Sequence, residues 1–333
     1  MAEDILYSIR NLTVEYRTRA GSVNAVDDVS LDIRRGEILG LVGESACGKS
    51  TLGKALMRLH TGPAKITGGE LWFDGRDLMT LSIREMPEIR GAEIGMVFQD
   101  PMTSLNPVQR ILEHLTETIQ CHEPEVSDTD ARKRAEELIE RLGIRKERIS
   151  EYPHQMSGGM RQRVMISLAL ALRAKLVIAD EPTTSLDVIV EAKFLDLLKE
   201  LQKEFGLTIL LITHNIGVVA EISDRIAVMY AAKIVEVGDI KDVFANPKHP
   251  YTQGLLRSVP NIILDGAELY KMAGAPPDLT HPPPGCRFHP RCPFVMEICR
   301  EESPPLVDIE AGQLAACWLY PSVVSKRQEK NHA

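Results

Sequence analysis

The sequence predicts an α/β fold with a mostly parallel sheet, and three observations lead to that class. A short apolar run at residues 37–42 is followed by a glycine-rich stretch and then by a helical pattern at residues 52–59. Two further apolar runs, at residues 176–180 and 208–213, flank an amphipathic stretch at residues 190–204. Short apolar strands that alternate with helices form parallel sheets covered on both faces.

The composition is that of a globular chain with an acidic balance. Of the 333 residues 44% are hydrophobic, and 39 basic against 47 acidic residues leave a net charge of −8. With no Lys/Arg block, this balance argues against a dedicated nucleic-acid surface. The N-terminus lacks the features of a signal peptide, and the longest apolar run, at residues 164–172, is less than half of the ~20 residues that a membrane span needs. We therefore expect a soluble chain that stays where it is made and meets a membrane only through a partner.

Several elements are predicted before and within this framework. Partial alternation at residues 5–16, 23–33 and 70–75 predicts an antiparallel sheet, and residues 93–99 supply one more buried strand. Residues 111–142 are predicted to be helical, with Asp128 as an N-cap.

The later part of the chain predicts a further helix, a hairpin and a change of domain. An apolar helix is predicted over residues 161–173 and a final hairpin over residues 227–238. Beyond about Asn246, prolines break regular structure. We therefore predict a nucleotide-binding domain at residues 1–245, with a helical insertion at about 100–165, and a small loop-rich extension at residues 246–333.

The glycine-rich stretch fits a P-loop, a loop that binds the phosphates of a nucleotide. It consists of Gly43, Glu44, Ser45, Ala46, Cys47, Gly48, Lys49, Ser50 and Thr51. The two glycines let backbone N–H groups turn toward phosphate oxygens at a helix N-terminus. Lys49 would reach the β- and γ-phosphates, and Ser50 would offer its hydroxyl to Mg²⁺. A glycine-rich turn with an incidental Lys-Ser pair is the alternative, but the flanking strand and helix favour a nucleoside triphosphate.

Two acidic residues and a histidine end the later apolar strands. Asp180 and Glu181 end the strand that begins at residue 176, and His214 follows residues 208–213. Ligands of open α/β sheets collect at this edge, where an aspartate can hold Mg²⁺ and the next carboxylate can activate water. An acidic pair is also a common helix cap, and a lone histidine is more often structural. The P-loop is what favours the catalytic interpretation.

The order of these motifs resembles that of the ATP-binding cassette (ABC) ATPases. The likeness covers about residues 5–245, and its most specific piece is Ser157-Gly158-Gly159 just before the apolar helix. The sequence lacks the Asn-Lys-x-Asp and Thr-Lys-x-Asp guanine motifs, which favours ATP over GTP. It departs from the family pattern at Ala46-Cys47, where Gly-Ser or Gly-Cys is common, and at Met160, where glutamine is more usual. Because backbone amides hold the phosphates, we expect the first departure to be tolerated.

The resemblance implies a role for each matching residue. Tyr16 would stack on adenine, and Gln99 would link the γ-phosphate and the metal to the helical insertion. Asp180 would serve Mg²⁺, Glu181 would be the general base, and His214 would be the γ-phosphate switch.

The resemblance also implies a site shared between two cassettes. Ser157, Gly158 and Gly159 would bind the γ-phosphate of ATP held by the opposite subunit, again at a helix N-terminus. Asp187 would communicate across the same interface. The partner is then a second ABC ATPase subunit, either a copy of this chain or a related one, and a single copy would hold ATP poorly placed for hydrolysis.

Further stretches are similar to the ATPase subunits of oligopeptide and dipeptide importers, a branch that includes nickel importers. They are residues 157–163, 99–107, 249–256 and 285–293, and the likeness to the D-type subunit runs nearly the whole chain. It implies a peripheral ATPase at the cytoplasmic face of the membrane that couples ATP binding and hydrolysis to conformational change in a permease. The partners would be two permease subunits and, indirectly, an extracytoplasmic peptide-binding protein, with no nucleic acid.

Four of the six cysteines gather near the C-terminus: Cys286, Cys292, Cys299 and Cys317. In a chain without an export signal, such a group is more often a metal or iron–sulfur site than a disulfide framework. Spacings of five, six and seventeen residues match neither zinc-ribbon pairs nor a ferredoxin run, so zinc and a 4Fe–4S cluster both remain open. The resemblance implies the cluster, with zinc or empty thiols as alternatives and a structural role favoured over redox sensing.

Two other classes of protein remain as alternatives. A non-transport ABC ATPase of repair or translation usually carries two cassettes or a coiled-coil insertion, whereas this chain has one cassette. A module that binds nucleotide without turnover is disfavoured by Glu181 and His214. Because permease and binding protein choose the substrate, the sequence leaves peptide and nickel both open.

Overall fold

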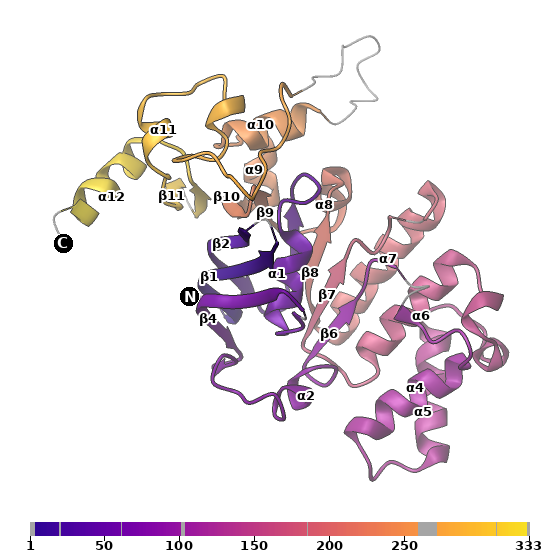
Figure 1. Cartoon of the computed structure of the whole chain (residues 1–333). Coiled ribbons are helices and arrows are strands. Elements are labelled where there is room, and N and C mark those ends of the chain that lie inside the picture. The colour runs from indigo at the N-terminus through magenta and orange to yellow at the C-terminus, as the bar shows by residue number, and fades with distance from the viewer. Residues whose placement is uncertain are drawn as a thin grey trace. The chain divides into compact units, whose positions relative to one another are not determined.

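The computed structural model describes residues 4–19, 21–60, 62–100, 104–184, 186–258, 272–310 and 312–331 (Figure 1). The chain forms two compact units, each built from separated stretches of sequence. The helical unit comprises Met1–Ile5, Ile33–Ile38 and Arg76–Ile212. The P-loop unit comprises Leu6–Asp32, Leu39–Gly75 and Thr213–Ala333.

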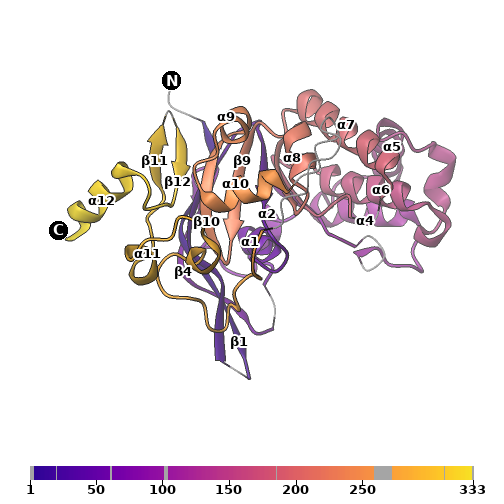
Figure 2. The ribbon, with the colours of Figure 1, turned by 90° about the horizontal axis from the view of Figure 1, so that it is seen from above.

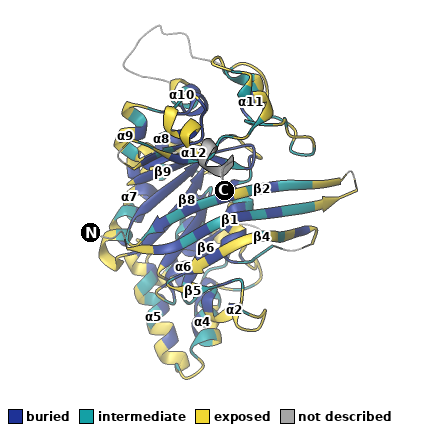
Figure 3. Cartoon of the chain, turned by 90° about the vertical axis from the view of Figure 1, so that its left-hand side faces the viewer, coloured by how far each residue is buried: buried dark blue, intermediate teal, exposed yellow. Residues whose placement is uncertain are grey.

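Long antiparallel strands form one sheet of the P-loop unit, as predicted. Strands β2 (Gly21–Arg34), β1 (Ile5–Thr18) and β4 (Ala64–Phe73) lie side by side in that order (Figure 3). Buried residues recur at every second position over much of β1, because one face of the sheet packs on a core. Tyr7 on that face donates its hydroxyl to the carbonyl of Leu56, 2.7 Å away, and so ties the sheet to helix α1 (Lys49–Leu56).

The strand before the P-loop belongs to a second sheet. Strand β3 (Ile38–Val42) is buried throughout and pairs in parallel with β9 (Arg225–Tyr230), which pairs antiparallel with β10 (Lys233–Asp239). The predicted hairpin is thereby confirmed. Ala231 and Ala232 form its turn with φ of 46° and 70°. This left-handed pair matches the twist of a hairpin, although the conformation is strained for alanine.

The proline-rich tail adds regular structure to this sheet. Strand β12 (Gln313–Ala315) pairs antiparallel with β10, and β11 (Val307–Glu310) pairs with β12 (Figure 2). A small core of Cys299, Val307, Trp318 and Val323 lies within the tail. Its short helices are η3 (His289–Arg291), α11 (Ile298–Glu301) and α12 (Pro321–Asn331). The tail is therefore less irregular than its prolines indicate, and the domain division at residue 245 stays a prediction.

A buried carboxylate fastens the start of helix α10 (Pro250–Arg257) to strand β10. Glu236 is fully buried and accepts hydrogen bonds from the backbone N–H groups of Lys248, at 2.7 Å, and His249, at 2.8 Å. Gln313 of β12 donates a third, at 2.8 Å. A negative charge is favoured at a helix N-terminus. Glu236 therefore links β10, β12 and α10. Two further helices of the unit are α8 (Ile216–Ile222) and α9 (Ile240–Ala245).

The imidazole of His249 should make the P-loop unit sensitive to acid. Burial lowers the pKa of His249 from 6.5 to about 3, and its Nδ1 accepts a hydrogen bond from the Tyr251 N–H at 3.1 Å. Because the unfolded chain binds this proton at higher pH than the folded chain, stability falls as the pH drops below 6.5. We expect a loss of about 1.5 kcal/mol between pH 6.5 and about pH 5, measured by denaturant unfolding.

Asparagine offers a matched replacement, because its side chain can cap the same helix. His249→Asn should lower the overall stability but remove this part of the pH slope. The control His281→Asn changes an exposed histidine and should retain the slope. An unchanged slope in His249→Asn would contradict the assignment.

In the helical unit, three short parallel strands are buried throughout. Strands β6 (Ile94–Val97), β7 (Leu176–Asp180) and β8 (Thr208–Thr213) pair in register, and β7 and β8 have the predicted bounds. A Cβ on Gly95 would lie 2.6 Å from the carbonyl oxygen of Ala169, so α6 (Gly158–Leu170) packs directly on β6. Helix α7 (Val188–Phe205) follows β7 and ends at Gly206, whose φ is 60°.

The predicted helical stretch at residues 111–142 is confirmed as two helices, α4 (Ile111–His122) and α5 (Asp128–Arg141). Each buries one face, because its buried residues recur every four positions, as an amphipathic helix requires. In α4 they are Ile111, Leu115 and Ile119, and in α5 they are Ala131, Ala135 and Ile139. The N-cap of α5 is Ser127, whose hydroxyl accepts from the Asp130 N–H, so the prediction of Asp128 was wrong by one position.

The remaining elements are short. They are β5 (Arg76–Asp77), α2 (Met86–Ile89), η1 (Lys146–Ser150) and η2 (Pro153–Gln155). None of the helices in the described parts of the chain is long and apolar enough to cross a membrane.

Candidate nucleotide-binding site

Both glycines of the P-loop are required by the close approach of neighbouring backbone. A Cβ on Gly43 would lie 2.0 Å from the carbonyl oxygen of Met229, and one on Gly48 would lie 2.0 Å from that of Ala25. Gly48 also has a φ of 111° and caps α1 without a side-chain hydrogen bond. The first turn of α1 therefore begins with N–H groups that no cap side chain occupies, as an anion-binding loop requires.

The departure at Ala46 has a structural cost. Ala46 adopts a φ of 62°, a conformation that glycine adopts without strain. The residue is exposed, so its methyl group meets no packing conflict. The expected tolerance of alanine is thus consistent with its surroundings, at a cost of about 1 kcal/mol.

The P-loop lysine is folded back onto its own loop. Lys49 is buried, and its Nζ donates to the carbonyls of Gly43 at 2.7 Å and Glu44 at 3.0 Å. Tyr16 on β1 approaches the other end of the motif, with its hydroxyl 3.3 Å from Thr51 Oγ1. The structure therefore brings Tyr16 to the P-loop, while its stacking on adenine stays a prediction.

The acidic pair follows β7 with an unusual backbone. Asp180 is buried at the end of the strand, and Glu181 has a φ of 47°. The Glu181 N–H donates to Ile212 O at 2.8 Å, and the Thr184 hydroxyl donates to Glu181 Oε2 at 2.9 Å. A non-glycine residue held at positive φ by surrounding bonds is a frequent feature of active sites.

Gln99 belongs to the same sheet edge as the acidic pair. Val97 of β6 is the register partner of Ala179 of β7, and Gln99 and Glu181 each follow two residues later. Gln99 is the second residue after the end of β6. Its link to the γ-phosphate stays a prediction.

The tripeptide Ser157-Gly158-Gly159 opens α6. Ser157 is the N-cap, and its Oγ accepts from the Met160 N–H at 3.4 Å. A Cβ on Gly159 would lie 2.6 Å from Val190 Cγ1, which explains why glycine stands there. Asp187 caps the neighbouring helix α7 by accepting from the Val190 N–H at 3.0 Å.

The predicted residues divide between the two units. The P-loop, Tyr16 and the exposed His214 belong to the P-loop unit. Gln99, the acidic pair and the Ser-Gly-Gly tripeptide belong to the helical unit. The role predicted for each residue, and the joint action of both groups on one nucleotide, stay predictions.

Two residues that contact the P-loop were not singled out from the sequence. The Tyr251 hydroxyl accepts from the Glu44 N–H at 2.9 Å, and Arg291 donates to both carboxylate oxygens of Glu44, at 2.8 and 3.0 Å. Both lie in stretches whose sequence indicates only a branch of the family. No local pattern links them to a loop more than 200 residues earlier.

The four C-terminal cysteines form no disulfides. The Cys317 thiol lies within electrostatic reach of the other three, and three of the sulfurs accept backbone N–H bonds, from Phe288, Phe294 and Leu319. Burial raises the pKa of Cys317 to about 12 and that of Cys286 to about 11, and neighbouring thiols add to both shifts. These two thiols are therefore protonated at neutral pH unless a bound metal replaces the proton.

A metal site at these cysteines is not confirmed. Within the described residues, no group of three or more His, Cys, Asp or Glu side chains is arranged to hold a metal ion. This finding gives no support to the zinc alternative, because zinc requires four ligand atoms about 2–2.3 Å from one centre. The same finding gives no support to a 4Fe–4S cluster.

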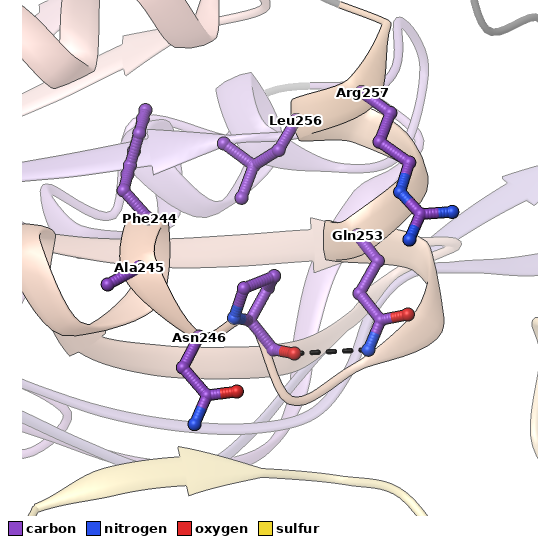
Figure 4. A pocket seen from close by; sticks show the side chains of 7 residues that line it. Phe244, Ala245, Asn246, Gln253, Leu256 and Arg257 are labelled. Carbon is purple, nitrogen blue, oxygen red and sulfur yellow. Dashed lines mark hydrogen bonds between the residues drawn. The ribbon is translucent and has the colours of Figure 1, made fainter.

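A separate pocket lies between helices α9 and α10. It has a volume of about 430 Å³ and is lined by Phe244, Ala245, Asn246, Pro247, Gln253, Leu256 and Arg257 (Figure 4). Gln253 closes one side by donating to the Pro247 carbonyl at 3.1 Å. None of these residues belongs to a predicted nucleotide motif.

Comparison with known proteins shows the family to which the chain is similar. A family model described as ABC transporter matches residues 26–184, and one described as oligopeptide/dipeptide transporter, C-terminal region, matches residues 235–299. The first range contains the P-loop, the Ser-Gly-Gly tripeptide and the acidic pair. The second contains three of the four clustered cysteines.

Relatives of known role match nearly the whole chain. The dipeptide transport ATP-binding protein DppD of Bacillus subtilis is 47% identical over 315 residues, which are 94% of each chain. The oligopeptide transport ATP-binding protein OppD of Salmonella typhimurium is 46% identical over 317 residues, 95% of this chain and 94% of that protein. The chain belongs to the family of ABC transporter ATP-binding proteins and is an ABC ATPase. Within that family it belongs to the branch that carries the oligopeptide/dipeptide transporter C-terminal region.

Solved structures of the family share the fold. The dimeric post-hydrolysis structure of the ATP-binding cassette MJ0796, bound to ADP and Pi, has a TM-score of 0.64 and 31% identity, covering 70% of this chain and 98% of that one. The structure of cbiO1 from Clostridium perfringens has a TM-score of 0.63 and 30% identity, covering 73% of this chain and 92% of that one. The α/β fold of an ABC ATPase, predicted from the sequence, is confirmed.

Proposed function

We propose that this chain is the ATP-hydrolysing subunit of an ABC importer for di- or oligopeptides. The observation that carries the proposal is the similarity to DppD and OppD over nearly the whole chain. The match to the C-terminal region of oligopeptide/dipeptide transporters adds to it. Its partners are a second ABC ATPase subunit, identical or related, two permease subunits and, indirectly, an extracytoplasmic peptide-binding protein. The chain would act at the cytoplasmic face of the membrane.

The site residues divide the work of hydrolysis. The P-loop amides and Lys49 hold the phosphates, and the buried Asp180 with Ser50 and Gln99 offers the hard oxygen ligands that Mg²⁺ prefers. Mg²⁺ neutralises charge on the transferring phosphoryl group when bound. Glu181 takes the proton of the attacking water, and His214 contacts the γ-phosphate.

Two cassettes would complete each other's sites. The Ser157 turn at the start of α6 presents N–H groups to the nucleotide held by the opposite subunit. Closure around ATP and opening after hydrolysis form a two-state element, and α4 and α5 would pass that motion to the permease.

The function is tested on the assembled transporter. The chain, its genomic neighbour ATPase and the permease subunits are co-purified in lipid nanodiscs, and ATP hydrolysis is measured with the binding protein and a defined set of di- and oligopeptides. Peptide should stimulate hydrolysis several-fold. Stimulation by Ni²⁺ with none by peptide would reassign the substrate, and no assembly with the permease would remove the transport function.

We further propose that the four clustered cysteines hold a 4Fe–4S cluster. The cluster is larger than a single ion, so its four thiolates stand farther apart than zinc ligands do. Mutual proximity of the thiols, their lack of disulfides and the N–H bonds to three sulfurs support this proposal. The cluster would act as a staple for a tail whose own core is small.

Iron analysis checks the cluster directly. Chain purified without oxygen should contain about four irons and a broad visible absorbance that bleaches on chelation. Cys292→Ser should lose iron and lower the midpoint of thermal unfolding, while Cys121→Ser, which changes an exposed cysteine outside the group, should keep both. Zinc without iron, or full iron retention in Cys292→Ser, would reject the proposed ligand set.

A further inference from the structure

The C-terminal tail binds Glu44, the second residue of the P-loop, through an ion pair with Arg291 that we call the clamp. Arg291 of η3 donates from two nitrogens to the Glu44 carboxylate, at 2.8 and 3.0 Å, and its side chain is only 6% exposed. A bidentate guanidinium–carboxylate pair fixes orientation as well as distance. Because the guanidinium is removed from solvent, this pair belongs to a better-shielded class than an ordinary surface ion pair.

The clamp also holds the backbone of Glu44. The Glu44 N–H donates to the hydroxyl of Tyr251, which is fully buried in α10. Tyr251 packs against Tyr230 with ring centroids 4.5 Å apart, and Arg291 donates to the Tyr230 hydroxyl at 3.2 Å. Phe288 closes the group edge-on to Tyr230, at 5.2 Å. Arg291 therefore contacts the P-loop from a position beside a packed group of aromatic side chains.

The clamp lies next to the phosphate-binding lysine. The carbonyl of Glu44 accepts a hydrogen bond from Lys49 Nζ at 3.0 Å. The amide, carboxylate and carbonyl of Glu44 are thus all engaged, two of them by residues of the C-terminal region. A shift of Glu44 would move the loop that has to present its amides to the phosphates.

Arg291 is in turn positioned by the turn between two of the clustered cysteines. The His289 N–H donates to Cys286 O at 2.9 Å, and the Cys292 N–H donates to His289 O at 3.3 Å. Arg287, in the same turn, pairs with Asp27 and donates to Ala231 O. Arg291 therefore connects the turn at residues 286–292 to Glu44 of the P-loop, and Arg287 connects it to Asp27 and Ala231.

We propose that the turn at residues 286–292 is a positioning element for the P-loop, and that it sets nucleotide affinity through the Arg291–Glu44 pair. An ordered turn holds Glu44 in the shape that binds phosphates, and a disordered turn releases it. By linkage, bound nucleotide should stabilise the turn to the same extent. The proposal rests on nucleotide binding at the P-loop, which is part of the proposed function.

The test measures ATP affinity in the full chain, purified without oxygen, by titration calorimetry at a temperature where all variants give the same circular dichroism. Arg291→Gln and Glu44→Gln should each raise the Kd for ATP about tenfold. Arg291→Lys keeps the charge but loses the bidentate hydrogen bond, so its Kd for ATP should lie between that of the wild type and that of Arg291→Gln. The double variant should have a Kd for ATP no higher than that of the weaker-binding single variant, because both substitutions break the same Arg291–Glu44 pair.

Arg300→Gln is the matched control, since Arg300 lies in the same tail with a side chain 58% exposed and a 3.7 Å contact to Glu297. It should leave the Kd unchanged. An unchanged Kd in Arg291→Gln, or fully additive losses in the double variant, would overturn the clamp. If wild-type chain itself fails to bind ATP while Arg291→Gln remains folded, the proposed function fails instead.

A second readout separates positioning from mere folding. In the assembled transporter, Arg291→Gln should raise the KM for ATP with little change in kcat, because the hydrolysing groups Glu181 and Gln99 follow strands β7 and β6 of the helical unit. ATP should also slow alkylation of Cys286 and Cys292 in iron-depleted wild-type chain and should do so less in Arg291→Gln. Equal protection in both proteins would contradict the coupling.

Discussion

Glu181→Gln is expected to lower kcat for ATP hydrolysis by about 10²–10⁴-fold while leaving ATP binding intact, because a general base contributes that factor. Glutamine keeps the size of the side chain and can still accept the hydrogen bond from the Thr184 hydroxyl. It cannot take a proton from water. The backbone at Glu181, with its φ of 47°, is anchored by a bond to Ile212 O that the substitution does not touch.

The measurement is steady-state phosphate release from the assembled transporter, with ATP binding followed in parallel. Glu200→Gln is the matched control, because it makes the same change at an exposed position on α7 of the same unit. It should retain wild-type turnover. Hydrolysis by Glu181→Gln within a few-fold of the control would show that another group accepts the proton.

The parts of the fold that could be predicted from the sequence are those that local chemistry determines. Strands β7 and β8 have the predicted bounds because each is a short apolar run ended by polar residues. The P-loop was predictable because Gly43 and Gly48 stand where backbone atoms leave no room for a Cβ. In each case a short stretch of sequence contains the signal.

The parts that could not be predicted depend on contacts that a motif does not specify. The choice of Ser127 over Asp128 as N-cap turns on which side chain meets the N–H of Asp130, and both residue types make good caps. The contact of Arg291 with Glu44 spans 247 positions. A periodicity or a motif contains no such information, so the sequence predicts a stapled appendage and not a support for the P-loop.

Lys49→Ala is expected to raise the Kd for ATP on the order of 100-fold, because it removes two charge-assisted contacts to phosphate. In the structure the ammonium group donates to the carbonyls of Gly43 and Glu44, so it already stands inside the loop. Nucleotide would exchange these carbonyls for phosphate oxygens with little movement of a side chain that is already ordered and buried. Alanine leaves the loop with its amides but without its positive charge.

Calorimetric titration with ATP and with ADP checks this prediction, and Lys54→Ala is the control. Lys54 lies in the last turn of the same helix with an exposed side chain, so its loss changes the net charge equally. The control should bind ATP like the wild type. Because Lys49 contacts the terminal phosphates, the loss should be larger for ATP than for ADP. Equal losses for both nucleotides would place the Lys49 contact on the phosphates that ATP and ADP share, and an unchanged Kd would remove Lys49 from the site.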